Sequence, residues 1–513
     1  MRLNPQAKNR DAFSTEHLQT DLKGKSVRGG IWTITSQGTQ FVLQSTATVM
    51  LARLLTPSDF GLVAMVTAIT TMGQAFADFG LSEATIQQPE ITHEQVSNLF
   101  WINVAIGTLL ASLAATLAPV LTWFYREPRL QSITLVLSLT FFIGGLRVQH
   151  DALLRRQMRF TALAIRDVVA SVLAVPSAIL LAWYGAGYWA IVALPLILTV
   201  TQVILSWVMV RWVPGLPKRN VSVRSMVSFG GNVAAAYLVF NINGNADNIL
   251  VGRFWGAGPL GLYSRAYNLL MLPIRQLGGP ARSVAVPGLS RVQDEPERLA
   301  RFYLRAVNLM IWIVAPLFGF LYVAALPVIV LALGAHWSAA APVFQILVIA
   351  ALGQVLLEST MWLLVSQGHG RQLLRLLLMS SPAIIGSYAV GVIFGIKGVA
   401  LCGSLVLIGI MPAMLKYSFR GTQLKVRDLA KSIVYPIAMS LAGICAAELE
   451  SLWYVPHSML ARLAVMAGSF ALGCACALIL EPVRRELMAL RKLFDRSDPV
   501  DAPIQTIVAT QPS

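Results

Sequence analysis

The chain has 513 residues, of which 56% are apolar and only 12% charged, and its mean hydropathy is +0.66. Soluble domains carry about 25% charged residues, so the composition excludes an ordinary soluble protein and indicates an all-α polytopic membrane protein. The net charge of +16 does not indicate nucleic-acid binding, because most of the 40 Lys and Arg residues fall in the tails, in the loops and at the span ends on one side of the predicted membrane.

Apolar runs of about 20 residues, the length that spans a hydrocarbon core, recur along the chain. They predict about fourteen membrane-spanning helices, at residues 29–55, 58–82, 95–123, 129–153, 160–183, 187–211, 226–252, 258–282, 302–326, 338–364, 372–394, 397–419, 429–449 and 458–480. No cleavable signal peptide is visible before the first run. The four cysteines lie within apolar runs and are interpreted as small core residues rather than as disulfides or metal ligands.

One element occurs twice. Arg53-Leu-Leu-Thr-Pro-Ser-Asp-Phe-Gly61-Leu62 and Arg253-Phe-Trp-Gly-Ala-Gly-Pro-Leu-Gly261-Leu262 each place an Arg before a Pro/Gly turn and Gly-Leu after it. Further pairs follow in the same order: Ser26-Val27-Arg28 with Ser222-Val223-Arg224, Asn98-Leu99 with Asn308-Leu309, Leu153-Leu154-x-x-Gln157 with Leu363-Leu364-x-x-Gln367, and Tyr184-Gly185 with Phe394-Gly395. Such ordered similarity predicts an internal duplication.

The distribution of Lys and Arg predicts that both termini are cytoplasmic. Each copy holds six spans, an even number, so the two copies are expected to be parallel repeats that form two lobes around a central cavity, followed by two terminal helices. The expected segments are a cytoplasmic tail (1–28), an N-lobe (29–212), a linker (213–225), a C-lobe (226–420), helices 13–14 (421–482) and a cytoplasmic C-terminal tail (483–513).

The first hairpin of each copy carries polar side chains within its apolar runs. In the first span, Thr33, Gln37, Gln40, Gln44 and Thr48 share one helical face. Polar residues also occur in the second, seventh and eighth spans: Thr67, Thr71, Gln74, Asp78, Asn241, Asn243, Asn245, Asp247, Asn248, Tyr263, Arg265, Tyr267, Asn268, Arg275 and Gln276. Isolated Ser and Thr are expected to bond neighbouring helices, whereas a stripe along a whole span favours a water-filled cavity.

Ionised side chains within a span cost about 2.5–3.5 kcal/mol on insertion scales and call for a partner or a function. Such residues are Asp78, Asp247, Arg265 and Glu358. Asp247 has two open interpretations, an ion pair with Arg253 or Arg265, or a role with substrate or protons. Arg265 is the preferred substrate residue, because its forked donors fit a diphosphate. The candidate cavity residues are Arg265, Asp247, Arg253, Arg53, Asp78, Gln37, Gln40, Gln44, Gln74, Asn241, Asn245 and Asn268.

Several stretches carry a family resemblance. They are Asn245-Ala-Asp-Asn-Ile-Leu-Val-Gly-Arg-Phe254 followed by Leu260-Gly-Leu-Tyr-Ser-Arg-Ala-Tyr-Asn-Leu269, then Ala52-Arg-Leu-Leu-Thr-Pro-Ser-Asp-Phe-Gly61, Asp78-Phe-Gly-Leu-Ser82, and Leu154-Arg-Arg-Gln-Met-Arg-Phe160. They resemble Wzx-type polysaccharide flippases of the WzxC-like branch, within the multidrug/oligosaccharidyl-lipid/polysaccharide exporter superfamily.

The resemblance implies transport of undecaprenyl-diphosphate-linked oligosaccharide units across the bacterial inner membrane for exopolysaccharide or lipopolysaccharide assembly, by a monomer without a cofactor. It implies membrane lipids, a polysaccharide polymerase and glycosyltransferases as partners. The coupling ion, H⁺ or Na⁺, stays open.

The sequence leaves two alternatives to the flippase function. A drug/cation antiporter of the same superfamily is disfavoured by the extra helix pair and the few buried acids. A membrane-embedded polymerase or glycosyltransferase is disfavoured because the outer loops are short and hold no acidic or histidine cluster. His336 and His457 are interpreted as isolated interfacial residues, and His150-Asp151 as a polar cluster at headgroup level. No phosphate-binding glycine loop of an ATPase is present.

Overall fold

The computed structural model describes residues 22–77, 81–87, 91–218, 241–454, 456–481, 483–485 and 487–488. All regular secondary structure in these ranges is helical. Asp78 and the Ser222-Val223-Arg224 stretch lie outside the described residues, as do the side chains of Thr33 and Gln74.

The chain forms two compact units. The first comprises Met1–Arg265, Ala332–Trp337 and Ser381–Val399, and the second Ala266–Leu331, Ser338–Ser380 and Ala400–Ser513. The boundary falls within one helix, α11 (Ala257–Arg291). The lobes expected at residues 29–212 and 226–420 remain a prediction.

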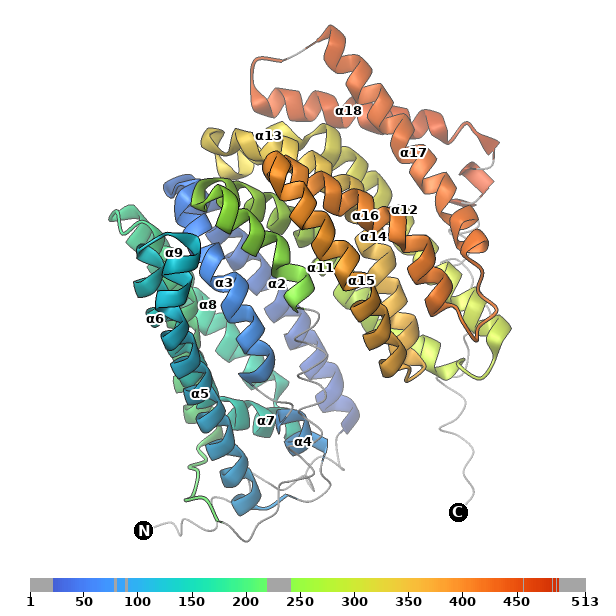
Figure 1. The fold of residues 1–513 in the computed structure, drawn as a ribbon. Helices are drawn as coiled ribbons and strands as arrows, with labels where there is room; N and C mark the ends of the chain where they lie inside the picture. Colours follow the sequence, from blue (N-terminus) through green and yellow to red (C-terminus); the bar gives the residue numbers. More distant parts are fainter. Residues whose placement is uncertain are drawn as a thin grey trace, which may run out of the picture. The chain divides into compact units, whose positions relative to one another are not determined.

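The first unit is built mainly from α2 to α9 and the helical segment 241–255. The bounds are α2 Leu22–Leu54, α3 Pro57–Ala77, α4 Leu81–Gln87, α5 His93–Tyr125, α6 Arg129–Gly145, α7 Val148–Arg156, α8 Phe160–Trp183 and α9 Tyr188–Val210. Helix α5 packs along α6, α8 along α9, and α2 along α8, while α3 contacts α5, α6 and α9 (Figure 1).

Local sequence explains how α5 begins and how closely it packs. Thr92 and Gln95 form a reciprocal capping box, with each side chain accepting a backbone N–H of the other residue. Gly107 allows α5 to approach α6, because a Cβ at this position would lie 2.6 Å from the carbonyl oxygen of Phe141. Small residues of this kind let membrane helices pack backbone to backbone.

The second unit contains the remaining long helices. The bounds are α12 Pro296–Val323, α13 Ala325–Leu333, η2 Ala335–Ala340, α14 Ala341–Ser366, α15 Gly370–Gly391, α16 Gly395–Ser418, α17 Val426–Trp453 and α18 Met459–Ala477. Of these, α13, η2, α15 and α16 also reach into the first unit, and the short η3 (Val392–Phe394) lies wholly within it. Helix α17 packs against α12 and α18 (Figure 1). Ser440 of α17 donates to the carbonyl oxygen of Ala315 in α12 at 2.8 Å.

Nine helical stretches of the described residues are long and apolar enough to cross a membrane. They are His93–Tyr125, Arg129–Arg156, Phe160–Trp183, Tyr188–Val210, Pro296–Val323, Ala335–Ser366, Gly370–Ser418, Val426–Trp453 and Met459–Ala477. The 49-residue stretch Gly370–Ser418 covers two predicted spans. A polytopic helical membrane protein is therefore confirmed, whereas the number fourteen stays a prediction.

Two helices differ from the expected ranges. The predicted span 129–153 is interrupted, because α6 ends at Gly145 and α7 starts at Val148. The predicted span 258–282 continues as α11 to Arg291, through Pro273, Pro280 and Pro287. Neighbouring helices and side chains can satisfy the backbone groups that proline frees in membrane proteins.

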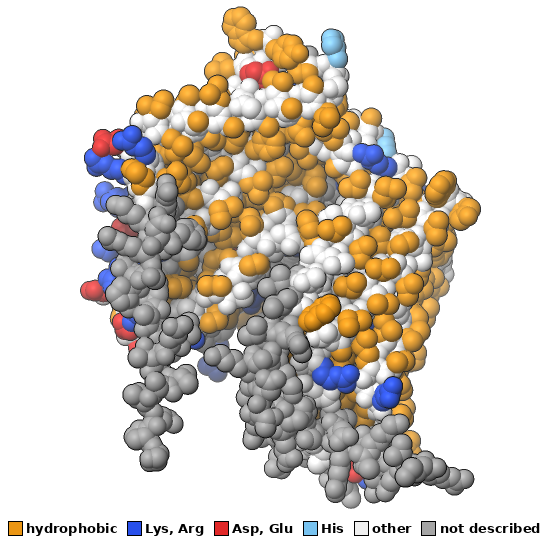
Figure 2. Space-filling model, turned by 180° about the vertical axis from the view of Figure 1, so that it is seen from behind, with side chains coloured by type: hydrophobic (Ala, Val, Ile, Leu, Met, Phe, Trp, Pro, Cys, Tyr) orange, Lys and Arg blue, Asp and Glu red, His pale blue; other side chains and the backbone are white. Residues whose placement is uncertain are grey.

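Apolar side chains cover much of the described surface, with few Lys or Arg among them on the face seen in Figure 2. Exposed leucines and tryptophans on α5, such as Leu109 and Trp123, are suited to hydrocarbon. The prediction that the cysteines are core residues is wrong for Cys445 and Cys476, which are exposed. Cysteine behaves as a small apolar side chain, so a lipid-facing position accommodates it as well as a core does.

In two of the repeated motif pairs, the two copies have the same backbone conformation. After Leu153-Leu154, the N–H groups of residues 157, 158 and 159 donate to the carbonyls of residues 153, 155 and 154. After Leu363-Leu364, residues 367, 368 and 369 donate to residues 363, 365 and 364. Met158 has a φ of 53° and Gly368 a φ of 70°, and in the second pair Gly185 and Gly395 have φ values of 80° and 82°.

Candidate functional site

The twice-written turns lie against each other in the first unit. Helix α3 begins at Pro57 and α11 at Ala257. A Cβ on Gly61 would lie 1.7 Å from the carbonyl oxygen of Ala257, and a Cβ on Gly261 would lie 1.8 Å from that of Pro57. Any side chain at either glycine would therefore push the two helix starts apart. The residues that identify the duplication also form this reciprocal contact.

Arg265 lies beside this contact, on the ring of Phe60. Its guanidinium carbon is 3.9 Å from the ring centroid, and its Nε has no hydrogen-bond partner among the described residues. A cation over an aromatic face gains about 0.5–2 kcal/mol. The face-on contact leaves the donors at the edge of the guanidinium without an acceptor from the described part of the chain. Arg265 thus combines a held position with unused donors.

Asp247 is buried and bonded to a tyrosine. One carboxylate oxygen accepts the Tyr263 hydroxyl at 2.8 Å and the other accepts the Asn248 backbone N–H at 2.8 Å. Of the two open interpretations of Asp247, the ion pair with Arg253 or Arg265 is not formed among the described residues. The Arg253 guanidinium instead lies 5.5 Å from the ring centroid of Phe124. The sequence could not show this, because Tyr263 reaches Asp247 only through the packing of two helices.

The end of α2 is bonded by a segment from much later in the chain. The Trp337 indole N–H donates to the carbonyl oxygen of Ala52 at 2.8 Å, and His336 Nε2 lies 2.9 Å from the same oxygen. These contacts satisfy a carbonyl that would have no partner within the helix. Trp337 also packs edge-on against Phe60, at 5.4 Å between centroids. His336 is exposed, as expected of an interfacial residue, but is not isolated.

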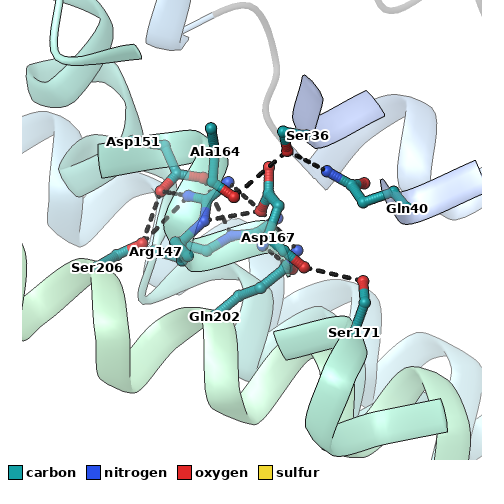
Figure 3. A network of polar contacts seen from close by, with 10 residues as sticks. Ser36, Gln40, Arg147, Asp151, Ala164, Asp167, Ser171, Gln202 and Ser206 are labelled. Atoms are coloured by element: carbon teal, nitrogen blue, oxygen red, sulfur yellow. Dashed lines mark hydrogen bonds and ion pairs between the residues drawn. The ribbon is translucent and has the colours of Figure 1, made fainter. Parts of the chain in front are cut away.

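The polar stripe of α2 divides into two sets. Gln40 donates to the Ser36 hydroxyl at 3.0 Å, and buried Ser36 donates to the carbonyl oxygen of Ala164 in α8 (Figure 3). Gln37 and Gln44 are exposed. One part of the stripe therefore holds α2 on α8, and the other is available to solvent or ligand.

The other predicted polar residues are mostly engaged near their own helices. The hydroxyl of Thr71 donates to the carbonyl oxygen of Thr67 at 2.8 Å. The side chain of Asn245 donates to the carbonyl oxygen of Asn241 at 2.9 Å. Arg53 and Asn268 are exposed. The structure thus brings Arg265 beside the paired turns, which themselves begin with Arg53 and Arg253.

A buried ionic network was missed in the sequence. It joins α6–α7, α8 and α9 through Arg147, Asp151, Arg166, Asp167, Gln202 and Ser206 (Figure 3). Arg166 is only 5% exposed and pairs with both Asp151 and Asp167, the latter at 2.7 Å. The positive charges of the two arginines are matched by the negative charges of the two aspartates. The adjacent Arg166-Asp167 within the apolar run 160–183 was the signal that could have revealed it.

His150 lies beside this network in an aromatic cluster. Its ring stacks on Trp207 at 4.5 Å between centroids, and its Nε2 is 3.2 Å from the carbonyl oxygen of Trp212. His150 is fully buried, and Asp151 joins the ionic network. That this pair lies at headgroup level, as the sequence suggests, remains a prediction.

Comparisons with known proteins agree with this architecture. The chain is 27% identical over 343 residues to the teichuronic acid biosynthesis protein TuaB of Bacillus subtilis (strain 168), covering 66% of this chain and 71% of that protein. It is 24% identical over 333 residues to the lipopolysaccharide biosynthesis protein WzxC of Escherichia coli (strain K12), covering 64% and 68%. The structure matches the lipid II flippase MurJ in an inward closed conformation with a TM-score of 0.69 at 12% identity, over 87% of this chain and 99% of that one.

The resemblance to WzxC-like proteins is thereby confirmed, and the fold is similar to that of the protein named as the lipid II flippase MurJ. Its apolar helices and its relatives make the protein a multi-pass protein of the inner membrane. A family model described as polysaccharide biosynthesis protein matches residues 50–342, more than half of the sequence, and the chain belongs to this family.

Proposed function

We propose that this protein flips undecaprenyl-diphosphate-linked oligosaccharide units across the inner membrane for the assembly of a surface polysaccharide. The observation that carries the proposal is the family match over residues 50–342. Two relatives are named for the biosynthesis of teichuronic acid and lipopolysaccharide, and the fold is that of a protein named as a lipid II flippase. Both termini are proposed to be cytoplasmic.

Two parallel repeats of six spans, with two terminal helices, form the proposed architecture. The shared turn conformations of residues 153–159 and 363–369 support it, as do those at Gly185 and Gly395. The reciprocal contact of Gly61 and Gly261 supports it further, because equivalent residues of a duplicated chain meet in this way around a two-fold axis.

In this proposal, transport proceeds by alternating access and the paired turns form a contact that is made and broken in each cycle. The contact depends on close backbone approach at Gly61 and Gly261. A contact between backbone groups of this kind can be broken without leaving a buried charge unpaired.

Arg265 is the proposed diphosphate residue. The guanidinium is held on Phe60, and its edge donors are free to take phosphate oxygens. The exposed Gln37 and Gln44 of α2 are proposed to contact the sugar. Asp78, Gln74, Arg53, Arg253, Gln40, Asn241, Asn245 and Asn268 remain candidates, whereas the contacts of Asp247 favour a structural role.

Deletion of the gene tests the function. We expect lipid-linked repeat units to accumulate on the cytoplasmic leaflet and the surface polymer to disappear, with both restored by the gene in trans. Normal polymer output from a clean deletion would contradict the proposal. Sensitivity to cationic drugs with intact polymer would instead indicate a drug/cation antiporter. Contact with a polymerase or with glycosyltransferases is part of the proposal and is testable by crosslinking in the same strain.

A further inference from the structure

A cationic cavity of about 580 Å³ lies in the second unit, at the helix ends where α14, α15 and α16 meet. Three arginines line it, two from the start of α15 and one just after α16. The lining residues used here are His369, Arg371, Gln372, Arg375, Tyr417 and Arg420. Among the residues that the structure describes, no Asp or Glu lines the cavity.

The three guanidinium groups have no carboxylate partner among the described residues. Elsewhere in the same unit, Arg298 pairs with Glu295 at 3.1 Å and Arg301 with Glu297 at 3.6 Å. Arg371 and Arg375 are four residues apart on α15, a spacing at which like charges repel. An anion in the cavity would remove this repulsion.

The cavity wall is held in place by contacts between α15 and α16. Gln372 donates to the carbonyl oxygen of Tyr417 at 3.0 Å, and the Arg420 guanidinium carbon lies 5.0 Å from the Tyr417 ring centroid. The Tyr417 ring thereby orients one guanidinium before any ligand binds. Planar guanidinium groups with paired donors are well matched to phosphate oxygens.

An apolar surface continues from the cavity along α15. Leu378 and Met379 follow Arg375 by three and four residues and thus lie on the same side of the helix, and they are 50% and 71% exposed. A ligand that fills the cavity and covers this surface has an anionic phosphate head and apolar chains. This combination describes a phospholipid and not a free phosphate.

We propose that this cavity binds the headgroup of an anionic phospholipid, with its acyl chains along Leu378 and Met379. The site is independent of the flippase assignment and separate from Arg265 and the paired turns. The lipid is a structural or regulatory ligand here, held at a defined position rather than attracted by the general positive charge of the protein.

Lipid binding to the full-length purified protein tests the proposal by native mass spectrometry. We expect phosphatidylglycerol to bind more tightly than phosphatidylethanolamine. The triple variant R371Q/R375Q/R420Q should weaken phosphatidylglycerol binding about fivefold per arginine, the equivalent of about 1 kcal/mol for each basic residue at a membrane surface. The matched control is K425Q/R427Q/K431Q, which removes the same charge from exposed positions of the same unit outside the cavity.

Equal weakening in both triple variants would overturn the proposal, because it would show only diffuse attraction. A photoactivatable phosphatidylglycerol on the unaltered protein avoids dependence on a variant that fails to fold. Its crosslinks are expected on α15 around Leu378 and Met379, and crosslinks spread evenly over the helices would contradict the site. Inorganic pyrophosphate is titrated in parallel. If it requires the three arginines and phosphatidylglycerol does not, the occupant is a soluble anion and the lipid assignment is wrong.

Discussion

At the scale of single residues, the structure separates two charged side chains that looked alike in the sequence. Arg265 lies on the face of Phe60 with donors left over, whereas Asp247 has both carboxylate oxygens engaged. Both are charges in predicted membrane helices, where an ionised group is costly. The difference in their partners leads to opposite expectations for their variants.

We expect Arg265→Ala to abolish polymer export while the protein stays in the membrane. Arg265→Lys should restore export only in part, because lysine supplies a point charge without the fork that binds a phosphate through two hydrogen bonds. The measurement is surface polymer per cell at matched protein level. Lys397→Ala, an exposed charge in the same unit, serves as a control and is expected to export normally. Full activity of Arg265→Ala would place this charge outside the substrate path.

Asp247→Asn is expected to retain most of the export activity, because an amide can still accept from Tyr263. Tyr263→Phe should lower stability by about 1–3 kcal/mol, since it leaves a buried carboxylate oxygen without its donor. Thermal unfolding in detergent measures the change in stability, and surface polymer measures the change in export, so the two effects can be separated. Loss of export in Asp247→Asn at a normal protein level would show that the carboxylate carries a proton or contacts substrate.

At the scale of helices, the reciprocal glycine contact makes a sharp prediction. Gly61→Ala and Gly261→Ala each place a methyl group within 2 Å of a backbone carbonyl oxygen, so the starts of α3 and α11 must separate. We expect both variants to lower export, and thiol labelling of a nearby engineered cysteine to increase. Gly258→Ala is the matched control in the same first turn of α11, because a Cβ there meets nothing within 4 Å. Unchanged labelling in the two variants would contradict the contact.

The ionic network predicts a large loss of stability from a single substitution. Arg166→Met should cost about 3–5 kcal/mol, because it leaves the largely buried carboxylate of Asp151 with fewer partners and removes the pair with Asp167. Glu297→Gln breaks the exposed pair with Arg301 and is expected to cost at most about 1 kcal/mol. Denaturant unfolding in detergent compares the two. An equal loss of unfolding free energy in both variants would show that burial does not make the network more stabilising than an exposed ion pair.

At the scale of the whole molecule, the sequence was sufficient for the class of protein and for the family. Length and apolarity of the runs predict helices, since a membrane span must satisfy its own backbone hydrogen bonds. The repeated turn was recognisable in the sequence because both copies keep a glycine, Gly61 and Gly261. The close backbone contact at these two positions leaves no room for a side chain. The break between α6 and α7 was not predicted, because both pieces are helical, although the polar residues of α7 contrast with the apolar α6.

The partners of side chains were the least predictable part of the site. Tyr263 beside Asp247 and Phe60 beneath Arg265 depend on how two hairpins cross, which periodicity does not encode. Arg166-Asp167 was visible in the sequence as a charged pair within the apolar run 160–183, which is itself a signal of a buried partner. Its partners Asp151 and Gln202 lie on other helices, and only the packing of α7, α8 and α9 brings them together.

The central claim, that the protein flips a lipid-linked oligosaccharide, is tested most directly by reconstitution. Purified protein is placed in liposomes that contain an undecaprenyl-diphosphate-linked oligosaccharide, and an impermeant sugar-modifying enzyme outside reports how much of the lipid becomes accessible. The account predicts that liposomes with protein expose the inner pool and that liposomes without protein, or with Arg265→Ala, do not. Equal accessibility with and without the protein, at verified incorporation and under imposed H⁺ or Na⁺ gradients, would contradict it.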